Sequence, residues 1–134
     1  MKRGKKIIII VAGIVLAIIL VVVIFSAVQM RNMQKKADAL ENADIDMNRV
    51  KDGDYTAFTD MGLVKVEVEV SVKDHQITNV NILRHDNGKG KPAEVIVEEM
   101  VKENTDQVEA VSGATYSSEA IKNAVNKALQ KGLE

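Results

Sequence analysis

The stretch Val64-Lys65-Val66-Glu67-Val68-Glu69-Val70-Ser71-Val72-Lys73 alternates valine with a charged or polar residue at every step. Successive side chains of a β-strand point to opposite faces, so this pattern predicts a strand with one face on a core and one face in water. Such a half-buried strand is typical of an antiparallel sheet, because parallel sheets are covered on both faces.

The segments on either side of this strand also have the composition of strands and turns. Asp74-His75 predicts a tight turn, and residues 76–83 return as a second strand that carries Ile77, Val80 and Ile82. On the other side, residues 52–54 (Asp-Gly-Asp) form a turn signal and residues 55–59 a short strand. The sequence therefore predicts a meander of antiparallel strands.

Helical patterns follow the strands. Pro92 suits the first turn of a helix, and the apolar face of that helix consists of Ala93, Val95, Ile96, Val97, Met100 and Val101. A last helix is expected after residue 118, with Ile121, Ala124, Val125, Ala128 and Leu129 on its apolar face. Its polar face is expected to hold Lys122, Asn123, Asn126, Lys127 and Lys131. Strands followed by helices indicate an α+β domain.

The N-terminal part of the chain has the composition of a membrane anchor. Residues 7–30 carry no charge, and their 24 residues would span about 36 Å as a helix, enough for a hydrocarbon core of roughly 30 Å. The basic residues of segment 1–6 predict a cytoplasmic N-terminus and an extracytoplasmic C-terminal domain. A cleavable signal peptide is the alternative, with Ser26-Ala27-Val28 as its cleavage site, but its apolar stretch would be shorter.

These patterns divide the chain into a basic tail (1–6), a transmembrane anchor (7–30), a juxtamembrane helix and linker (31–51) and a folded domain (52–134). The helix is expected over residues 31–42.

The four charges before residue 31 are all positive, which leaves 14 basic and 19 acidic residues and a net charge of −5 in the remainder. Such an acidic domain is not expected to bind nucleic acid. The chain has no cysteine, which excludes disulfides and thiolate metal sites.

Four hydroxyl residues cluster before the predicted last helix: Ser112, Thr115, Ser117 and Ser118. Gly113 and Ala114 between them leave the backbone open to the approach of another group. The start of a helix offers backbone N–H donors and the positive end of the helix dipole, so this segment suits an anion such as phosphate. The alternative is that Ser117 or Ser118 only caps the helix.

The segment Val108-Glu109-Ala110-Val111-Ser112-Gly113-Ala114-Thr115-Tyr116-Ser117-Ser118 resembles the FMN-binding domain family. That family includes flavin-carrying subunits of Rnf complexes and of sodium-pumping NADH:quinone oxidoreductase, and small extracellular electron-transfer flavoproteins. The resemblance implies that FMN is esterified through its phosphate to Thr115 by an exported flavin transferase that uses FAD and a divalent metal. The expected cofactor-binding residues around Thr115 are Ser112, Gly113, Ala114, Ser117 and Ser118.

The resemblance extends over about residues 51–133. Asp52-Gly53-Asp54-Tyr55 is similar to the opening of the family's domain, and Val70-Ser71-Val72-Lys73-Asp74-His75-Gln76-Ile77-Thr78-Asn79-Val80 to its central hairpin. His85-Asp86-Asn87-Gly88-Lys89-Gly90-Lys91-Pro92-Ala93-Glu94 resembles the loop of its small stand-alone members. The sequence departs from the family at Glu109, where Asp is usual.

The resemblance implies a membrane-anchored, extracytoplasmic flavoprotein that relays electrons rather than a stand-alone enzyme. Its expected partners are the membrane, the flavin transferase and a membrane electron donor, with a quinone-linked dehydrogenase as one candidate. The alternative is a non-redox anchored module that is never flavinylated. For His85 two roles are open, a contact to the flavin or a surface position at a strand end. No cluster of His, Asp and Glu in the sequence suggests a metal site.

Overall fold

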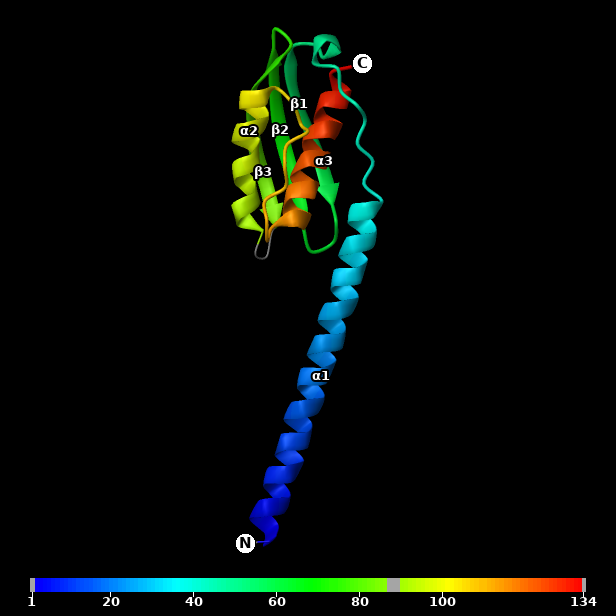
Figure 1. The fold of residues 1–134 in the computed structure, drawn as a ribbon, viewed down its shortest axis with the longest axis vertical. Coiled ribbons are helices and arrows are strands. Elements are labelled where there is room, and N and C mark those ends of the chain that lie inside the picture. The colour runs from blue at the N-terminus through cyan, green and yellow to red at the C-terminus, as the bar shows by residue number, and fades with distance from the viewer. Residues whose placement is uncertain (1, 87–89, 134) are drawn as a thin grey trace. The chain divides into compact units, whose positions relative to one another are not determined.

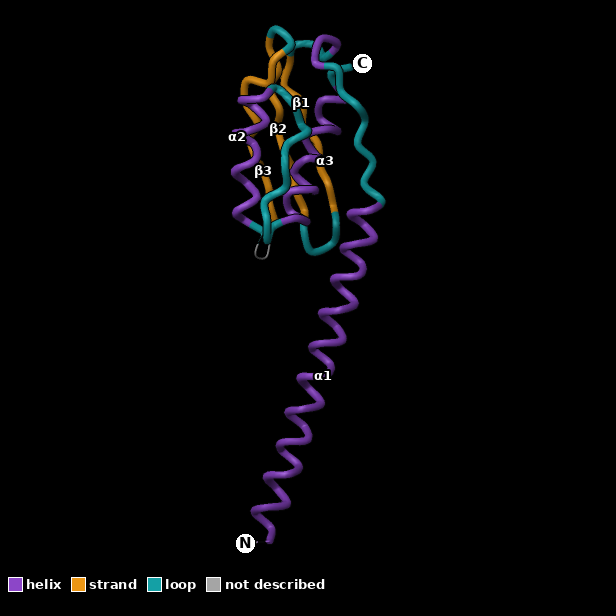
Figure 2. The backbone as a smooth tube through the Cα atoms, in the orientation of Figure 1, coloured by secondary structure: helices purple, strands orange, loops and turns teal. Residues whose placement is uncertain are grey.

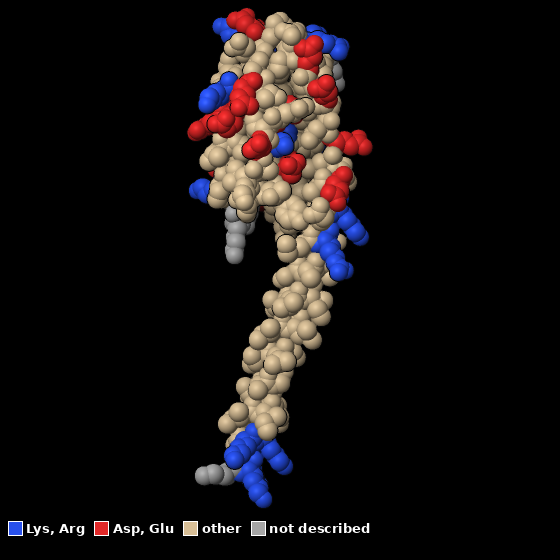
Figure 3. Space-filling model, viewed as in Figure 1, with Lys and Arg blue, Asp and Glu red and all other residues tan. Residues whose placement is uncertain are grey.

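The apolar N-terminal stretch lies in one long helix, α1 (Lys2–Asp38), in the computed structural model, which describes residues 2–86 and 90–133. This helix is long and apolar enough to cross a membrane, and the large apolar side chains of residues 7–30 are exposed, whereas Met33 near its end is buried. Figure 3 shows a stretch without charged residues between basic groups at its two ends. The helix ends at Asp38, so the prediction that it continues to residue 42 was wrong by four residues.

A second compact unit, Lys35–Glu134, contains the sheet (Figure 1). Strands β1 (Gly53–Asp60), β2 (Lys65–Lys73) and β3 (Gln76–Asp86) are antiparallel neighbours in the order β1-β2-β3. Val66, Val68 and Val70 of β2 are fully buried, whereas the residues between them are partly exposed. The alternation read from the sequence is therefore confirmed.

The hairpin between β2 and β3 is closed by Asp74 and His75, which both have positive φ angles. Two positive φ angles in a two-residue loop are the mark of a type I′ turn, whose twist suits a hairpin. The pairing of β2 with β3 shifts register twice, between Glu67 and Val68 and between Ser71 and Val72. Each shift adds a residue to β3 and moves the next side chains to the other face of the sheet.

The two α-helices that follow the strands in the chain lie on one face of the sheet (Figure 1). Helix α3 (Thr115–Lys131) packs on β1 and β2, and α2 (Ile96–Glu103) packs on β3. A short 3-10 helix, η2 (Lys91–Val95), leads into α2 and has Pro92 in its first turn, as predicted. Its last residue, Val95, is 58% exposed and does not belong to the apolar face that the sequence suggested.

The segment between α1 and β1, residues 39–52, is called the connector here, and it includes the 3-10 helix η1 (Met47–Arg49). Figure 2 shows it as a loop that runs alongside α3. Asn126 accepts a hydrogen bond from the amide of Ala43 (3.0 Å) and donates one to its carbonyl (2.8 Å). Asn123 donates to the carbonyl of Glu41 (3.2 Å). The connector is thus fixed to the domain.

These contacts correct the predicted polar face of the last helix. Asn123 and Asn126 are fully buried, not exposed, because their amides bind the connector and other buried groups. Asn126 also donates to a carboxylate oxygen of Asp106 (2.8 Å), and Asn123 accepts from the hydroxyl of Thr59 (2.7 Å). Buried amides need such partners, and here they find them.

Candidate functional site

The predicted site lies at the first turn of α3. Gly113 has a φ of +81°, a left-handed conformation that favours glycine, and no atom lies within 4 Å of the position a Cβ would take. The amide of Ala114 donates to the carbonyl of Val111 (3.0 Å), which closes the turn before the helix. Thr115 is the first residue of α3 and its side chain is exposed. Gly113 and Thr115 are thus exposed to solvent, whereas Ala114 between them is buried.

The four hydroxyl residues of this segment fall into two pairs. Ser112 and Thr115 are exposed, whereas Ser117 and Ser118 are 2% and 0% exposed. The hydroxyl of Ser118 donates to the carbonyl of Ala114 (2.8 Å) and accepts from the amide of Val111 (3.0 Å). Ser118 therefore holds the turn in front of the helix, and its oxygen has two protein partners.

The position of the helix start differs from the prediction. The sequence placed the hydroxyl cluster before the helix, but Thr115, Ser117 and Ser118 form its first turn. The N-cap residue is Ala114, so neither Ser117 nor Ser118 caps the helix. Ala114 has no side-chain acceptor, and the amides of the first turn of an α-helix have no acceptor within the helix. A helix start without a side-chain cap is a position that suits an anion.

Ser117 belongs to a group of three hydrogen-bonded side chains, called the triad here: Ser117, His85 and Glu94. Nε2 of His85 lies 2.9 Å from the hydroxyl of Ser117, and Nδ1 lies 2.9 Å from a carboxylate oxygen of Glu94. The side chain of His85 is 2% exposed and that of Glu94 is 35% exposed. The triad joins the end of β3, the helix η2 and the first turn of α3.

The chemistry of its two partners determines which ring nitrogen of His85 donates a hydrogen bond and which accepts one. An ionised carboxylate can only accept, so Nδ1–H of His85 donates to Glu94. In the neutral imidazole Nε2 is then an acceptor, and the hydroxyl of Ser117 donates to it. Because the side chain of His85 is only 2% exposed, the surface position that the sequence left open for this histidine is wrong.

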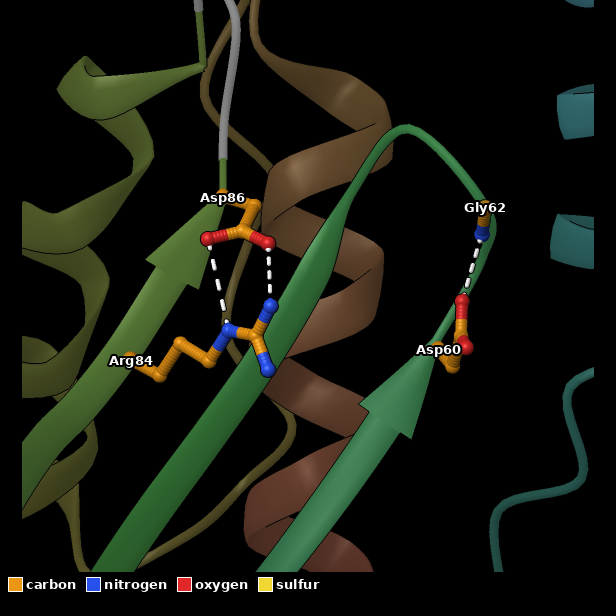
Figure 4. A network of polar contacts seen from close by, with 4 residues as sticks. All are labelled: Asp60, Gly62, Arg84 and Asp86. Carbon is orange, nitrogen blue, oxygen red and sulfur yellow. Dashed lines mark hydrogen bonds and ion pairs between the residues drawn. The ribbon is translucent and has the colours of Figure 1, made fainter.

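The neighbours of His85 in β3 lie on the other face of the sheet. Arg84 Nη2 binds a carboxylate oxygen of Asp86 at 2.8 Å, and Arg84 Nε binds the other at 3.4 Å (Figure 4). The same view shows Asp60 accepting from the amide of Gly62 in the turn after β1. Arg84 lowers the pKa of the Asp86 carboxyl, mainly through this hydrogen bond, and Asp86 raises the pKa of the guanidinium.

Three charged residues of the resembling segments remain to be placed: Glu109, Lys91 and Lys89. Glu109 is exposed and lines a hollow with Glu99 and Glu103, and Lys91 is exposed in the first turn of η2. Lys89 lies outside the described residues. Within the described ranges 2–86 and 90–133, no group of three or more His, Asp or Glu residues could hold a metal ion.

The family model described as FMN-binding domain matches residues 62–130, which is more than half of the chain. The matched region contains β2, β3, the triad and the start of α3, and it begins in the turn after β1. No curated protein and no solved structure matches the chain.

Proposed function

The chain belongs to the FMN-binding domain family, and we propose that it is an extracytoplasmic electron carrier with FMN esterified to Thr115. FMN is the cofactor of the family, and the N-terminal helix is long and apolar enough for a single-pass membrane anchor. The observation that supports the attachment site best is the exposure of Thr115 at the uncapped start of α3.

The residues around Thr115 fit a phosphate ester. Covalent attachment needs a hydroxyl that reagents can reach, room beside the backbone and donors for the phosphate oxygens. Thr115 supplies the exposed hydroxyl, Gly113 leaves the adjacent space open, and the first turn of α3 supplies amide donors. Ser112 is the second exposed hydroxyl in the segment, and its proposed role is to contact the phosphate rather than to form the ester.

The attachment reaction is a phosphoryl-type transfer without any change of oxidation state. The Thr115 hydroxyl oxygen forms a bond to the phosphorus that becomes the FMN phosphate, and the pyrophosphate bond of FAD breaks to release AMP. The hydroxyl proton leaves to a base of the flavin transferase. The chain itself supplies the acceptor oxygen and the donors that hold the phosphate.

Bound FMN would supply the redox chemistry, and the chain would supply its placement beside the membrane. Residues 7–30 contain no ionisable side chain, so the anchor offers no path for protons. In this proposal the electrons come from a membrane donor, for which a quinone-linked dehydrogenase is a candidate, and pass to a separate acceptor. Covalent attachment suits this location, because a cofactor that dissociated outside the cell would be lost.

The test is co-expression of the full chain with a flavin transferase, followed by denaturation and detection of flavin on the protein band. Thr115→Ala removes only the acceptor oxygen, so the domain should fold without covalent flavin. Thr115→Ser should retain modification, and Ser112→Ala should reduce it mildly. Covalent flavin on Thr115→Ala would contradict the assignment. A wild-type chain that never gains flavin would favour the non-redox module instead.

A further inference from the structure

The triad of Ser117, His85 and Glu94 has no part in the bond to FMN as proposed, yet it lies directly behind the attachment residue. Its members come from three segments of the chain, and Ser117 is only two residues after Thr115. The side chains of His85 and Ser117 are both almost completely buried. Polar groups buried in this way cost stability unless each has its partner, and here both ring nitrogens of His85 and the hydroxyl of Ser117 have one.

The geometry of the helix links Ser117 to Thr115. Successive residues of an α-helix are rotated by about 100°, so residues 115 and 117 point in directions about 200° apart. The hydrogen bond from Ser117 to His85 holds Ser117 toward the end of β3, and this turns Thr115 away from the domain and into solvent. Because Glu94 binds the other ring nitrogen, the imidazole cannot rotate without breaking a second hydrogen bond.

A serine paired with a histidine and a carboxylate is also the arrangement that activates a nucleophile. Ser117 is 2% exposed and faces inward, so a phosphorus centre could reach its oxygen only if the first turn of α3 moved. Thr115 is the exposed hydroxyl on the outer side of the same turn. The triad therefore suits a positioning role better than a nucleophilic one.

We propose that Glu94 and His85, acting through Ser117, are positioning residues that fix the first turn of α3 so that Thr115 is presented to the flavin transferase in one orientation. This proposal rests on the proposed function, because it concerns the rate at which Thr115 is modified. It predicts that loss of the triad slows flavin transfer while the surface that the transferase binds stays intact.

The test measures flavin transfer to the full chain in detergent micelles with purified transferase, FAD and Mg²⁺, at a temperature well below melting. Ser117→Ala removes the hydroxyl that joins α3 to His85. Its kcat should fall roughly tenfold, the rate equivalent of one positioning hydrogen bond, with KM for the chain unchanged. Ser117→Thr keeps a hydroxyl and should restore most of the rate.

Thr59→Val is the matched control. It removes another buried hydrogen bond between α3 and the sheet, from Thr59 to Asn123 (2.7 Å), about 12 Å along the helix from Thr115. It should lower the melting temperature as Ser117→Ala does, and leave kcat at the wild-type value. Glu94→Ala, in contrast, removes the acceptor that holds the Nδ1–H of His85 and should lower kcat in the same direction as Ser117→Ala.

Equal rates for Ser117→Ala and the wild type would overturn the positioning role. A loss of rate in Thr59→Val as large as that in Ser117→Ala would overturn it too, since the effect would then follow stability alone. If Ser117→Ala does not fold, failure of Ser117→Thr to be modified despite normal melting overturns the proposal. Absence of flavin on the wild type, or its presence on Thr115→Ala, would instead contradict the proposed function.

Discussion

The anchor stretch of α1 (residues 7–30) and the helix α3 are built from similar apolar residues, but those residues lie in different surroundings. Ile18 in α1 is 57% exposed, whereas Ile121 in α3 is fully buried. The anchor has no polar side, so no orientation against a sheet could keep it soluble, and a lipid bilayer is the surrounding that suits it. Helix α3 buries one side on the sheet and uses amides on another side to hold the connector.

The comparison teaches that the same apolar residue types belong to a core in one helix and suit a membrane in another. The difference lies in the polar residues, which are the majority in α3. In α3 these residues occur at intervals that give the helix a sheet side, a connector side and a solvent side. In the anchor stretch, residues 7–30, the only polar side chains are Ser26 and Gln29, both near its C-terminal end, so the stretch has no polar side.

The largest expected effect comes from making the same substitution, isoleucine to aspartate, in each of the two helices. Ile121→Asp buries a charge without a partner and also removes a fully buried isoleucine side chain, which together should cost about 5 kcal/mol or more. A loss of this size reaches the lower end of the total stability of a small domain, about 5–15 kcal/mol, so the domain should be largely unfolded. Ile18→Asp should leave the domain folded and weaken membrane insertion by about 2.5–3.5 kcal/mol. Circular dichroism melting and membrane fractionation of both full-length variants measure this. Unfolding by both, or by neither, would remove the distinction between the helices.

The orientation of the anchor gives the next largest effect. The basic residues before residue 7 should hold the N-terminus in the cytoplasm and place α3 and its domain outside. Protease added to intact cells, or to protoplasts where a wall intervenes, should therefore digest the domain completely. A domain that is protected until the membrane is broken would show the opposite orientation.

A smaller effect is expected for the amides on the connector side of α3. Asn126→Ala removes the hydrogen bonds to Ala43 and Asp106 and leaves buried partners unsatisfied, which should cost about 2–3 kcal/mol. Lys122→Ala on the solvent side removes only a surface contact to Glu119 and should cost about 0.5 kcal/mol or less. Denaturant titration of the full chain compares the two. Equal losses would show that the connector is not part of the fold.

The smallest expected effect concerns the exposed pair of Arg84 and Asp86. The pKa of Asp86 is lowered in the folded chain, so its contribution to stability is present above the ordinary pKa of an aspartate and is lost as the pH falls through the lowered value. Asp86→Asn should therefore melt slightly below the wild type near neutral pH, and the two should converge in acid. A difference that grows on acidification would contradict the sign of this effect.

The sequence predicted the regular parts of the domain because local patterns determine them. Alternating valines placed β2 with the correct face buried, and Asp74-His75 located the turn. Pro92 located the start of a helical segment. In each case the decisive residues are neighbours in the chain, so period and turn chemistry suffice.

The positions that the sequence did not predict depend on distant contacts. Asn123 and Asn126 were assigned to solvent by their polarity, but they are buried because the connector, about 80 residues earlier, lies against them. His85 is buried because the register shift between Glu67 and Val68 adds Leu83 to β3. This extra residue turns His85 toward the helices. A regular alternation from Ile82 would have placed Arg84 there. Without a way to predict the bulge, the triad could not be found.

The site was predicted in part. The hydroxyl residues and Gly113 within residues 112–118 predicted that this segment suits an anion. The resemblance to the FMN-binding domain family singled out Thr115 among them. The division of its four hydroxyl residues into exposed and buried pairs came only from the fold. The start of the helix and the burial of its first residues depend on where Gly113 turns the chain. Propensity alone placed this start four residues too late, after residue 118 instead of at Thr115.

Peptide mass spectrometry of the full chain, purified from membranes of cells that contain a flavin transferase, tests the central claim most directly. The account predicts one modified peptide, with the mass of FMN less water, and fragment ions that place the group on Thr115. Fragment ions that place FMN on Ser117 or Ser118, or an unmodified peptide in those cells, would contradict it.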